Sequence, residues 1–240
     1  MTDKERLKAF QMFEEYINTI AKDDLSWDEW RDLERKVSLE NRNLLVRINK
    51  GIKLSLKEKK ELNKEVIILV ETLKNDEKLM EVLRKWKSVS LESKLTFLER
   101  LAERFRANLN QGPTKNDKVT IILDGKMKPE ASMEKFVNNL YIQKKYLQKD
   151  GSWMDVLRLF AHEYHHHLQK KSEDPLIRFN RHYTVDLFSS DYDDFVEKGY
   201  RDQKTEQETF FIEDRLKEML SNGFLDDPKK RNSAKTGKDF

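Results

Sequence analysis

The sequence predicts an α+β fold that is mainly α, in which an N-terminal helical module precedes a small domain with a short β-sheet and a histidine-bearing helix. Between residues 3 and 108 the chain has no proline and a single glycine, Gly51, and Leu, Glu, Lys and Arg dominate, a composition that favours helix. A β-branched run over 119–125 then indicates a strand. Around residue 160, apolar residues recur at helical spacing.

Caps divide the N-terminal module, residues 1–112, into roughly four or five predicted helices. Ser26 stands three residues before Glu29, which is the spacing of a capping box, and Ser55 and Ser90 open two further helix-forming segments. The module has no internal repeat and no sustained heptad pattern. Such a bundle is typical of packing, or of docking a partner or a substrate.

The second domain is predicted to cover residues 113–225. Its clearest strand is the run at 119–125, and Asn139–Gln143 alternates apolar and polar residues as a half-buried or edge strand does. Ser152 is expected to N-cap the histidine-bearing helix. A final amphipathic helix is predicted from about Thr205 to Leu220.

For two stretches of the chain the sequence predicts no helix or strand. Residues 171–204 are rich in Asp, Ser, Arg and aromatic side chains, and long stretches of this kind often carry function. The polar and basic tail, residues 226–240, is expected to be disordered.

Composition and charge exclude several classes of protein. Lys+Arg 47 and Asp+Glu 44 nearly cancel and interleave along most of the chain, which argues against a nucleic-acid or membrane-surface partner. Cysteine is absent, so neither a disulfide nor a thiolate metal site can form. The longest apolar run, Val66–Val70, is too short to cross a bilayer, and the N-terminus lacks an apolar signal core. We therefore expect a cytoplasmic protein with no membrane partner.

His162, Glu163 and His166 form the pattern His-Glu-x-x-His. Residues four apart on a helix lie one turn above each other, so both imidazoles can bind one zinc ion while Glu163 reaches a water on that ion. Seven mostly apolar residues gather on one face of the same helix: Trp153, Met154, Leu157, Phe160, Ala161, Tyr164 and Leu168. The two histidines project from the opposite side, as metal ligands rather than core residues would.

A zinc site needs a third protein ligand, which must be a histidine or a carboxylate because cysteine is absent. His182 is one candidate. Glu206 and Glu208 are better ones, since they open the last predicted helix, which can pack against the first. His165 and His167 point roughly 60° or more away from the ligand pair and are expected to pack or to support the ligands.

The motif at 162–166, followed about 40 residues later by Glu206-Gln207-Glu208-Thr209, resembles the gluzincin metallopeptidases. It is most similar to small members of the ImmA/IrrE type, whose downstream motif reads approximately Glu-x-Glu-Ala-Asn-x-Phe-Ala, with the first Glu on the metal. The resemblance covers roughly residues 117–221. It implies a zincin-like domain, a Zn2+ cofactor and Glu206 as the third ligand.

The downstream match is incomplete. Thr209 replaces the Ala of the pattern, Phe210 replaces the Asn or Asp, and Glu213 replaces the final Ala. Glu208 therefore stays open as the alternative to Glu206.

The function predicted from this site is that of a zinc metalloendopeptidase acting on a protein or peptide substrate, with a metal-activated water and Glu163 as general base. By resemblance, the substrate would add as a strand beside Asn139–Gln143. Arg181, His182 and Tyr183 are candidates for oxyanion stabilisation, although packing is the alternative role of each.

A helical binding, adaptor or regulatory protein is the alternative function. Its zinc site would be structural or inactive, and its activity would reside in residues 1–110.

Overall fold

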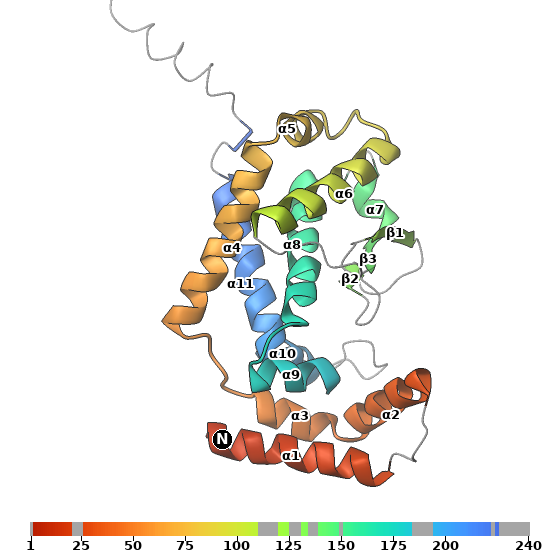
Figure 1. The fold of residues 1–240 in the computed structure, drawn as a ribbon, viewed down its shortest axis with the longest axis vertical. Helices are drawn as coiled ribbons and strands as arrows, with labels where there is room; N and C mark the ends of the chain where they lie inside the picture. The colour runs from red at the N-terminus through yellow and green to blue at the C-terminus, as the bar shows by residue number, and fades with distance from the viewer. Residues whose placement is uncertain are drawn as a thin grey trace, which may run out of the picture. The chain divides into compact units, whose positions relative to one another are not determined.

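The structure, a computed structural model, describes residues 2–20, 26–109, 120–124, 131–133, 139–148, 151–183, 194–221 and 224–225 of the 240-residue chain. This part of the chain is mostly helical (Figure 1). The helices before the strands are α1 (Asp3–Ile20), α2 (Trp27–Glu40), α3 (Arg42–Asn49), α4 (Leu56–Lys74), α5 (Glu77–Arg84) and α6 (Leu91–Asn108). Those after the strands are α7 (Lys144–Leu147), α8 (Trp153–Gln169), α9 (Pro175–His182), α10 (Asp194–Asp202) and α11 (Lys204–Ser221). Among the described residues, no helix combines the length and the apolar character needed to cross a membrane.

The strands are β1 (Thr120–Asp124), β2 (Ala131–Met133) and β3 (Asn139–Gln143), and they pair in the order β1-β3-β2. β3 is parallel to β1 and antiparallel to β2. The register places Thr120 opposite Asn139 and Ala131 opposite Ile142. Ile142, the strand residue whose side chain is described, is buried.

The prediction of an α+β fold with a zincin-like domain was wrong, because the described chain is mostly α-helical. The strands hold only five, three and five residues, whereas α8 and α11 hold 17 and 18. Two β-prone segments of the sequence do contain β1 and β3. The β-propensity of these two segments extends over only a few residues. Helix-forming residues dominate the rest of the described chain.

The prediction that Asn139–Gln143 offers a free edge was also wrong. β3 lies in the middle, paired with β1 on one side and β2 on the other. Its backbone groups are therefore engaged along the segment where a substrate strand would have to add.

The predicted N-caps are confirmed. Ser26 and Glu29 form a reciprocal capping box, the Ser55 hydroxyl accepts from the backbone amide of Glu58, and Ser90 caps α6. The described N-terminal half nevertheless contains six helices rather than four or five, since additional breaks occur at Asn41 and at Asp76, which caps α5.

The stretch at 171–204, left without elements by the sequence, contains α9 and α10. The final helix agrees with its prediction to within one residue at each end. The basic tail at 226–240 lies outside the described residues.

The chain forms two compact units, one of residues 1–59 with 165–210 and the other of residues 60–164 with 211–240. Each unit combines segments that are far apart in sequence. This division by contacts differs from the predicted boundary near residue 112, which stays a prediction.

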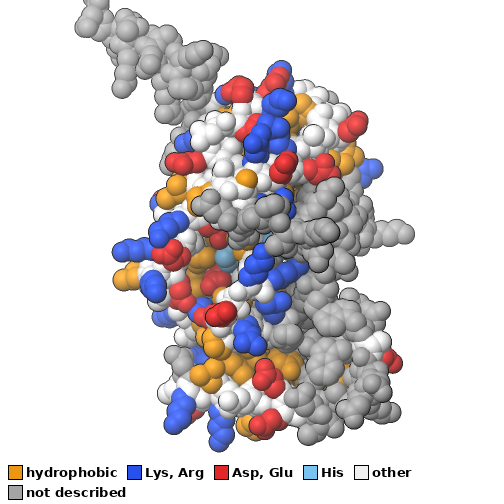
Figure 2. Space-filling model, viewed as in Figure 1, with side chains coloured by type: hydrophobic (Ala, Val, Ile, Leu, Met, Phe, Trp, Pro, Cys, Tyr) orange, Lys and Arg blue, Asp and Glu red, His pale blue; other side chains and the backbone are white. Residues whose placement is uncertain are grey.

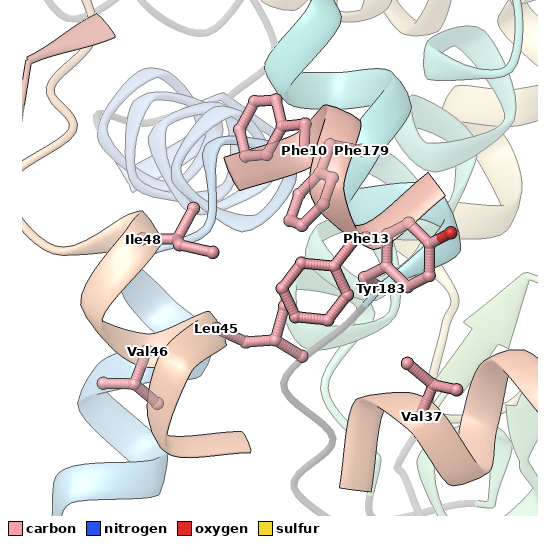
Figure 3. Close-up of a cluster of buried hydrophobic side chains, with 8 residues drawn as sticks. All are labelled: Phe10, Phe13, Val37, Leu45, Val46, Ile48, Phe179 and Tyr183. Atoms are coloured by element: carbon pink, nitrogen blue, oxygen red, sulfur yellow. The ribbon is translucent and has the colours of Figure 1, made fainter. Parts of the chain in front are cut away.

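An aromatic cluster holds the first unit together (Figure 3). Phe10 of α1 stacks on Phe179 of α9 with ring centroids 3.8 Å apart, and Phe13 approaches Tyr183 at 5.3 Å. The other buried members of this cluster are Val37, Leu45, Val46 and Ile48, from α2 and α3. Burial of these large apolar groups ties α9 to the N-terminal helices.

The second unit is tied together by apolar packing and by polar contacts to backbone. Tyr164 of α8, fully buried, packs on Phe105 of α6 with ring centroids 5.2 Å apart. Trp86 Nε1 donates to the carbonyl of Gly151 at 3.0 Å, and Lys94 Nζ donates to the carbonyl of Leu147 at 3.0 Å. These contacts fix the start of α8 against the α5–α6 region.

Helices α3 and α10 pack so closely that a methyl group does not fit between them. A Cβ atom on Gly199 would lie 2.3 Å from Cγ2 of Val46. We predict that Gly199→Ala lowers the free energy of unfolding by about 1–3 kcal/mol, because overpacking outweighs the roughly 1 kcal/mol gain in helix propensity. Urea unfolding measures this, and in a Val46→Ala background the same substitution should be tolerated. A more stable Gly199→Ala in the wild-type background would contradict the close approach.

Acid should weaken the contact between α4 and the start of α11. Lys204 pairs with Glu58 and with Asp174. Although burial raises the pKa of Glu58, hydrogen bonds from Lys204 and Ser55 outweigh it and lower the pKa to about 2. Since this value lies below the ordinary one of about 4.3, the charged form stabilises the fold above that pH, and the stabilisation is lost as the pH falls towards 2.

We therefore predict that Glu58→Gln costs about 1–3 kcal/mol of stability at neutral pH and much less near pH 2. Urea unfolding at both pH values measures the difference. Glu61→Gln, in which an exposed pair with Lys64 is lost from the same helix, is the matched control and should cost less than about 1 kcal/mol. Equal losses at both pH values in Glu58→Gln would contradict the ion-pair explanation.

Candidate metal site

Helix α8 carries the His-Glu-x-x-His motif and is buried around much of its circumference. Ser152 opens it as predicted, accepting a hydrogen bond from the amide of Met154 at 3.2 Å. The fully buried apolar residues of α8 are Val156, Leu157, Phe160 and Tyr164. His162 and Glu163 of the motif are only 8% and 7% exposed. The motif is therefore held in a mostly dehydrated environment, where a metal ion or a carboxylate exerts a strong electrostatic effect.

His162 is supported by a carboxylate from α11. Its Nδ1 lies 2.6 Å from Oε1 of Glu213, and Oε2 of Glu213 accepts from Nη2 of Arg158 at 2.8 Å. Burial raises the pKa of Glu213, but the hydrogen bond with His162 and the charge of Arg158 outweigh it, so the pKa lies below its ordinary value. An ionised carboxylate only accepts hydrogen bonds, so Nδ1 of His162 is the donor in this contact, and in the neutral imidazole Nε2 is then the nitrogen that can bind a metal ion.

His166 is oriented by a neutral partner one turn further along α8. Its Nδ1 lies 2.9 Å from Oε1 of Gln169. Nε2 of Gln169 donates to the carbonyl of Thr205 at 3.0 Å and to Glu208 at 2.8 Å, which determines which end of the amide faces His166. Nδ1 of His166 is therefore the donor in this contact, and in the neutral imidazole Nε2 is the nitrogen that can bind a metal ion.

Glu206, the predicted third ligand, lies close to His166. Oε1 of Glu206 lies 3.4 Å from Nε2 of His166, and the two side chains are 9% and 23% exposed. Along the unbroken helix α8, His162 stands one turn before His166. The ligand atoms of His162, His166 and Glu206 all lie within 4.8 Å of one another.

The distance between Glu206 and His166 fits two ligands of one metal ion. Two atoms each bound to zinc at about 2.0–2.1 Å in a tetrahedral arrangement lie ~3.3 Å apart. A direct hydrogen bond between the same atoms would be about 2.7–3.2 Å long, shorter than the observed 3.4 Å. Two imidazoles and one carboxylate are a donor set that zinc accepts. The residues present therefore fit a zinc ion.

Glu208 is engaged elsewhere. Its Oε2 accepts from Nε2 of Gln169 at 2.8 Å and lies 3.1 Å from Nε2 of His165. This buried network links the end of α8 to the start of α11. The geometry thus favours Glu206 over Glu208 as the third ligand, and it gives His165 the supporting place that the helical wheel predicts.

Arg181 and Tyr183, the described candidates for oxyanion stabilisation, make other contacts. Tyr183 is part of the aromatic cluster of the first unit, and Arg181 donates from Nη1 to the carbonyl of Lys170 at 2.7 Å. His182 ends α9, and its side chain lies outside the described residues. The described contacts of Arg181 and Tyr183 are those of packing residues.

Glu213 and Gln169 were not among the residues predicted from sequence. Glu213 was noted only as a departure from the downstream motif, and it lies 51 residues from His162. Gln169 follows His166 by three residues, a spacing that places both side chains on one helix face. That spacing was the local signal that could have identified Gln169.

No family model matches this chain, and neither does any curated protein or solved structure. The resemblance to gluzincins therefore rests on the motif residues themselves and stays a prediction.

Proposed function

We propose that this protein is a zinc-dependent metallopeptidase in which His162, His166 and Glu206 hold the metal and Glu163 is the general base. The observation that carries the proposal is the approach of the three ligand atoms to within 4.8 Å of one another. The contacts of both Nδ1 atoms support it further, because a histidine that binds a metal through one ring nitrogen usually makes a hydrogen bond through the other.

The reaction proposed is hydrolysis of a peptide bond. When bound, zinc supplies Lewis-acid chemistry that makes water acidic near neutral pH and polarises a carbonyl group. Glu163 takes a proton from the attacking water as the water oxygen bonds to the carbonyl carbon. It then delivers that proton to the amide nitrogen as the carbon–nitrogen bond breaks and the amine leaves. The burial of Glu163, at 7% exposure, shields this proton transfer from bulk water.

The proposed substrate is a protein or a peptide. Acidic and basic side chains are interspersed over the face seen in Figure 2, so no single-sign surface favours a polyanion there. β3 has no free edge for an added strand, so the substrate would be held by a surface other than this strand.

Metal content in purified protein tests the proposal. We predict about one zinc per chain in the wild type and a large loss in Glu206→Gln, which keeps the shape of the side chain but removes the anionic ligand. Glu208→Gln is the comparison variant and should lose much less zinc, because Glu208 contacts His165 and Gln169 and reaches His166 only through Gln169. Elemental analysis after dialysis against zinc-free buffer measures all three proteins.

Two results would count against this assignment. A wild type that binds no zinc even when the ion is supplied would refute the metal site. Loss of zinc in Glu208→Gln but not in Glu206→Gln, with both variants folded by circular dichroism, would refute the choice of ligand.

A further inference from the structure

Helix α11 contacts the motif at two positions. Glu206 lies near His166, and Glu213 contacts His162. Glu213 lies seven residues after Glu206 on the same helix, and its side chain is 12% exposed. Both of its carboxylate oxygens are engaged, Oε1 with Nδ1 of His162 at 2.6 Å and Oε2 with Nη2 of Arg158 at 2.8 Å. Arg158 stands one turn before His162 on α8. The three side chains therefore form a chain of contacts that ends on a proposed metal ligand.

This arrangement restrains the imidazole of His162 in two ways. The guanidinium of Arg158 holds one carboxylate oxygen, so the other oxygen is held in place against Nδ1. A hydrogen bond from Nδ1–H to an anion also makes the opposite nitrogen a stronger electron donor. Both effects favour binding of a cation at Nε2.

The residue that supports His166 is neutral, whereas the residue that supports His162 is anionic. Nδ1 of His166 contacts the amide oxygen of Gln169, which carries no net charge. Nδ1 of His162, by contrast, contacts the carboxylate of Glu213. The chain thus supports one histidine with an anion and the other with an amide.

We propose that Glu213, held by Arg158, is a positioning residue that orients His162 and strengthens it as a metal ligand. This inference rests on the proposed metal site and deepens it. Glu213 itself does not touch the metal or the substrate. Its removal weakens zinc binding while His162, His166 and Glu206 are all still present.

Zinc affinity measured by competition with a chromophoric chelator tests this inference. We predict that Glu213→Gln binds zinc roughly tenfold more weakly than the wild type, and Glu213→Ala up to about 100-fold more weakly. Arg158→Met should weaken zinc binding less than Glu213→Ala does, because the carboxylate remains. Glu218→Gln, with the same charge change at an exposed position of α11, is the matched control and should bind zinc as the wild type does.

Cobalt substitution supplies a readout that a merely structural role would not change. The visible absorption of Co2+ at the site reports ligand geometry, so Glu213→Ala should alter the band positions while Glu218→Gln should not. Thermal unfolding of the metal-free variants shows separately whether the fold has been weakened.

The outcomes separate this inference from the proposed function. Unchanged zinc affinity and an unchanged cobalt spectrum in Glu213→Ala, together with zinc loss in Glu206→Gln, would overturn the role of Glu213 and leave the metal site standing. A wild type without zinc would overturn both. Weaker binding in Glu213→Ala with normal binding in Glu218→Gln would support the positioning role.

Discussion

Glu163→Gln is expected to abolish hydrolysis while the protein keeps its zinc. The side chain keeps its size but can no longer accept a proton, so the general-base contribution, typically about 10²–10⁴-fold in rate, is lost. The ligand residues His162, His166 and Glu206 are unchanged, so the metal content should stay that of the wild type. The assay is zinc-dependent release of fluorescent fragments from labelled casein, alongside elemental analysis of the same preparations.

Glu218→Gln provides the control for this experiment, since it removes one negative charge from an exposed position of α11. It should cleave casein at the wild-type rate. Turnover by Glu163→Gln at the wild-type rate would exclude Glu163 as the base. Loss of zinc from Glu163→Gln would instead mean that this carboxylate supports the metal site.

The sequence predicted the helical half well because its signals are local. A near absence of proline and glycine favours helix over the first hundred residues, and caps such as Ser26 and Ser90 act within one turn. The break at Asp76 was missed because the pair Asn75-Asp76 is a short interruption between two segments of strong helix formers. Asp174 followed by Pro175 caps and opens α9, a signal that the polar composition of 171–204 concealed.

The motif was also predicted from a local rule. Residues four apart on a helix share a face, so the pairing of His162 with His166 followed from spacing alone. Glu206 came from resemblance, and its approach to His166 agrees with that expectation in geometry, while metal binding itself stays a prediction.

The supporting residues depend on how α8 and α11 pack, which no local rule supplies. Glu213 contacts a residue 51 positions away, and Glu208 contacts His165 across 43 positions. Helical periodicity alone does not identify which acid of α11 faces which histidine. The same limit explains the wrong fold class, because the extent of a sheet depends on pairing between distant segments.

Removal of the metal is expected to abolish hydrolysis without unfolding the protein. Tyr164 of α8 packs against Phe105 of α6, and Phe160 stacks on Tyr164, and neither contact involves a ligand residue. Burial of each such aromatic side chain contributes about 1.5–3 kcal/mol, so the helix has a core of its own. In small domains without such a core, a structural zinc supplies roughly 10–16 kcal/mol and its removal unfolds the chain.

Dialysis against 1,10-phenanthroline, followed by far-ultraviolet circular dichroism and casein cleavage, distinguishes these two roles of zinc. A metallopeptidase should lose cleavage, keep its helical signal at room temperature, and recover activity when zinc is returned. Its unfolding temperature should fall, since a ligand that binds only the folded state stabilises that state. Collapse of the helical signal on chelation would make the zinc structural and would favour a helical binding protein whose activity resides in the N-terminal helices.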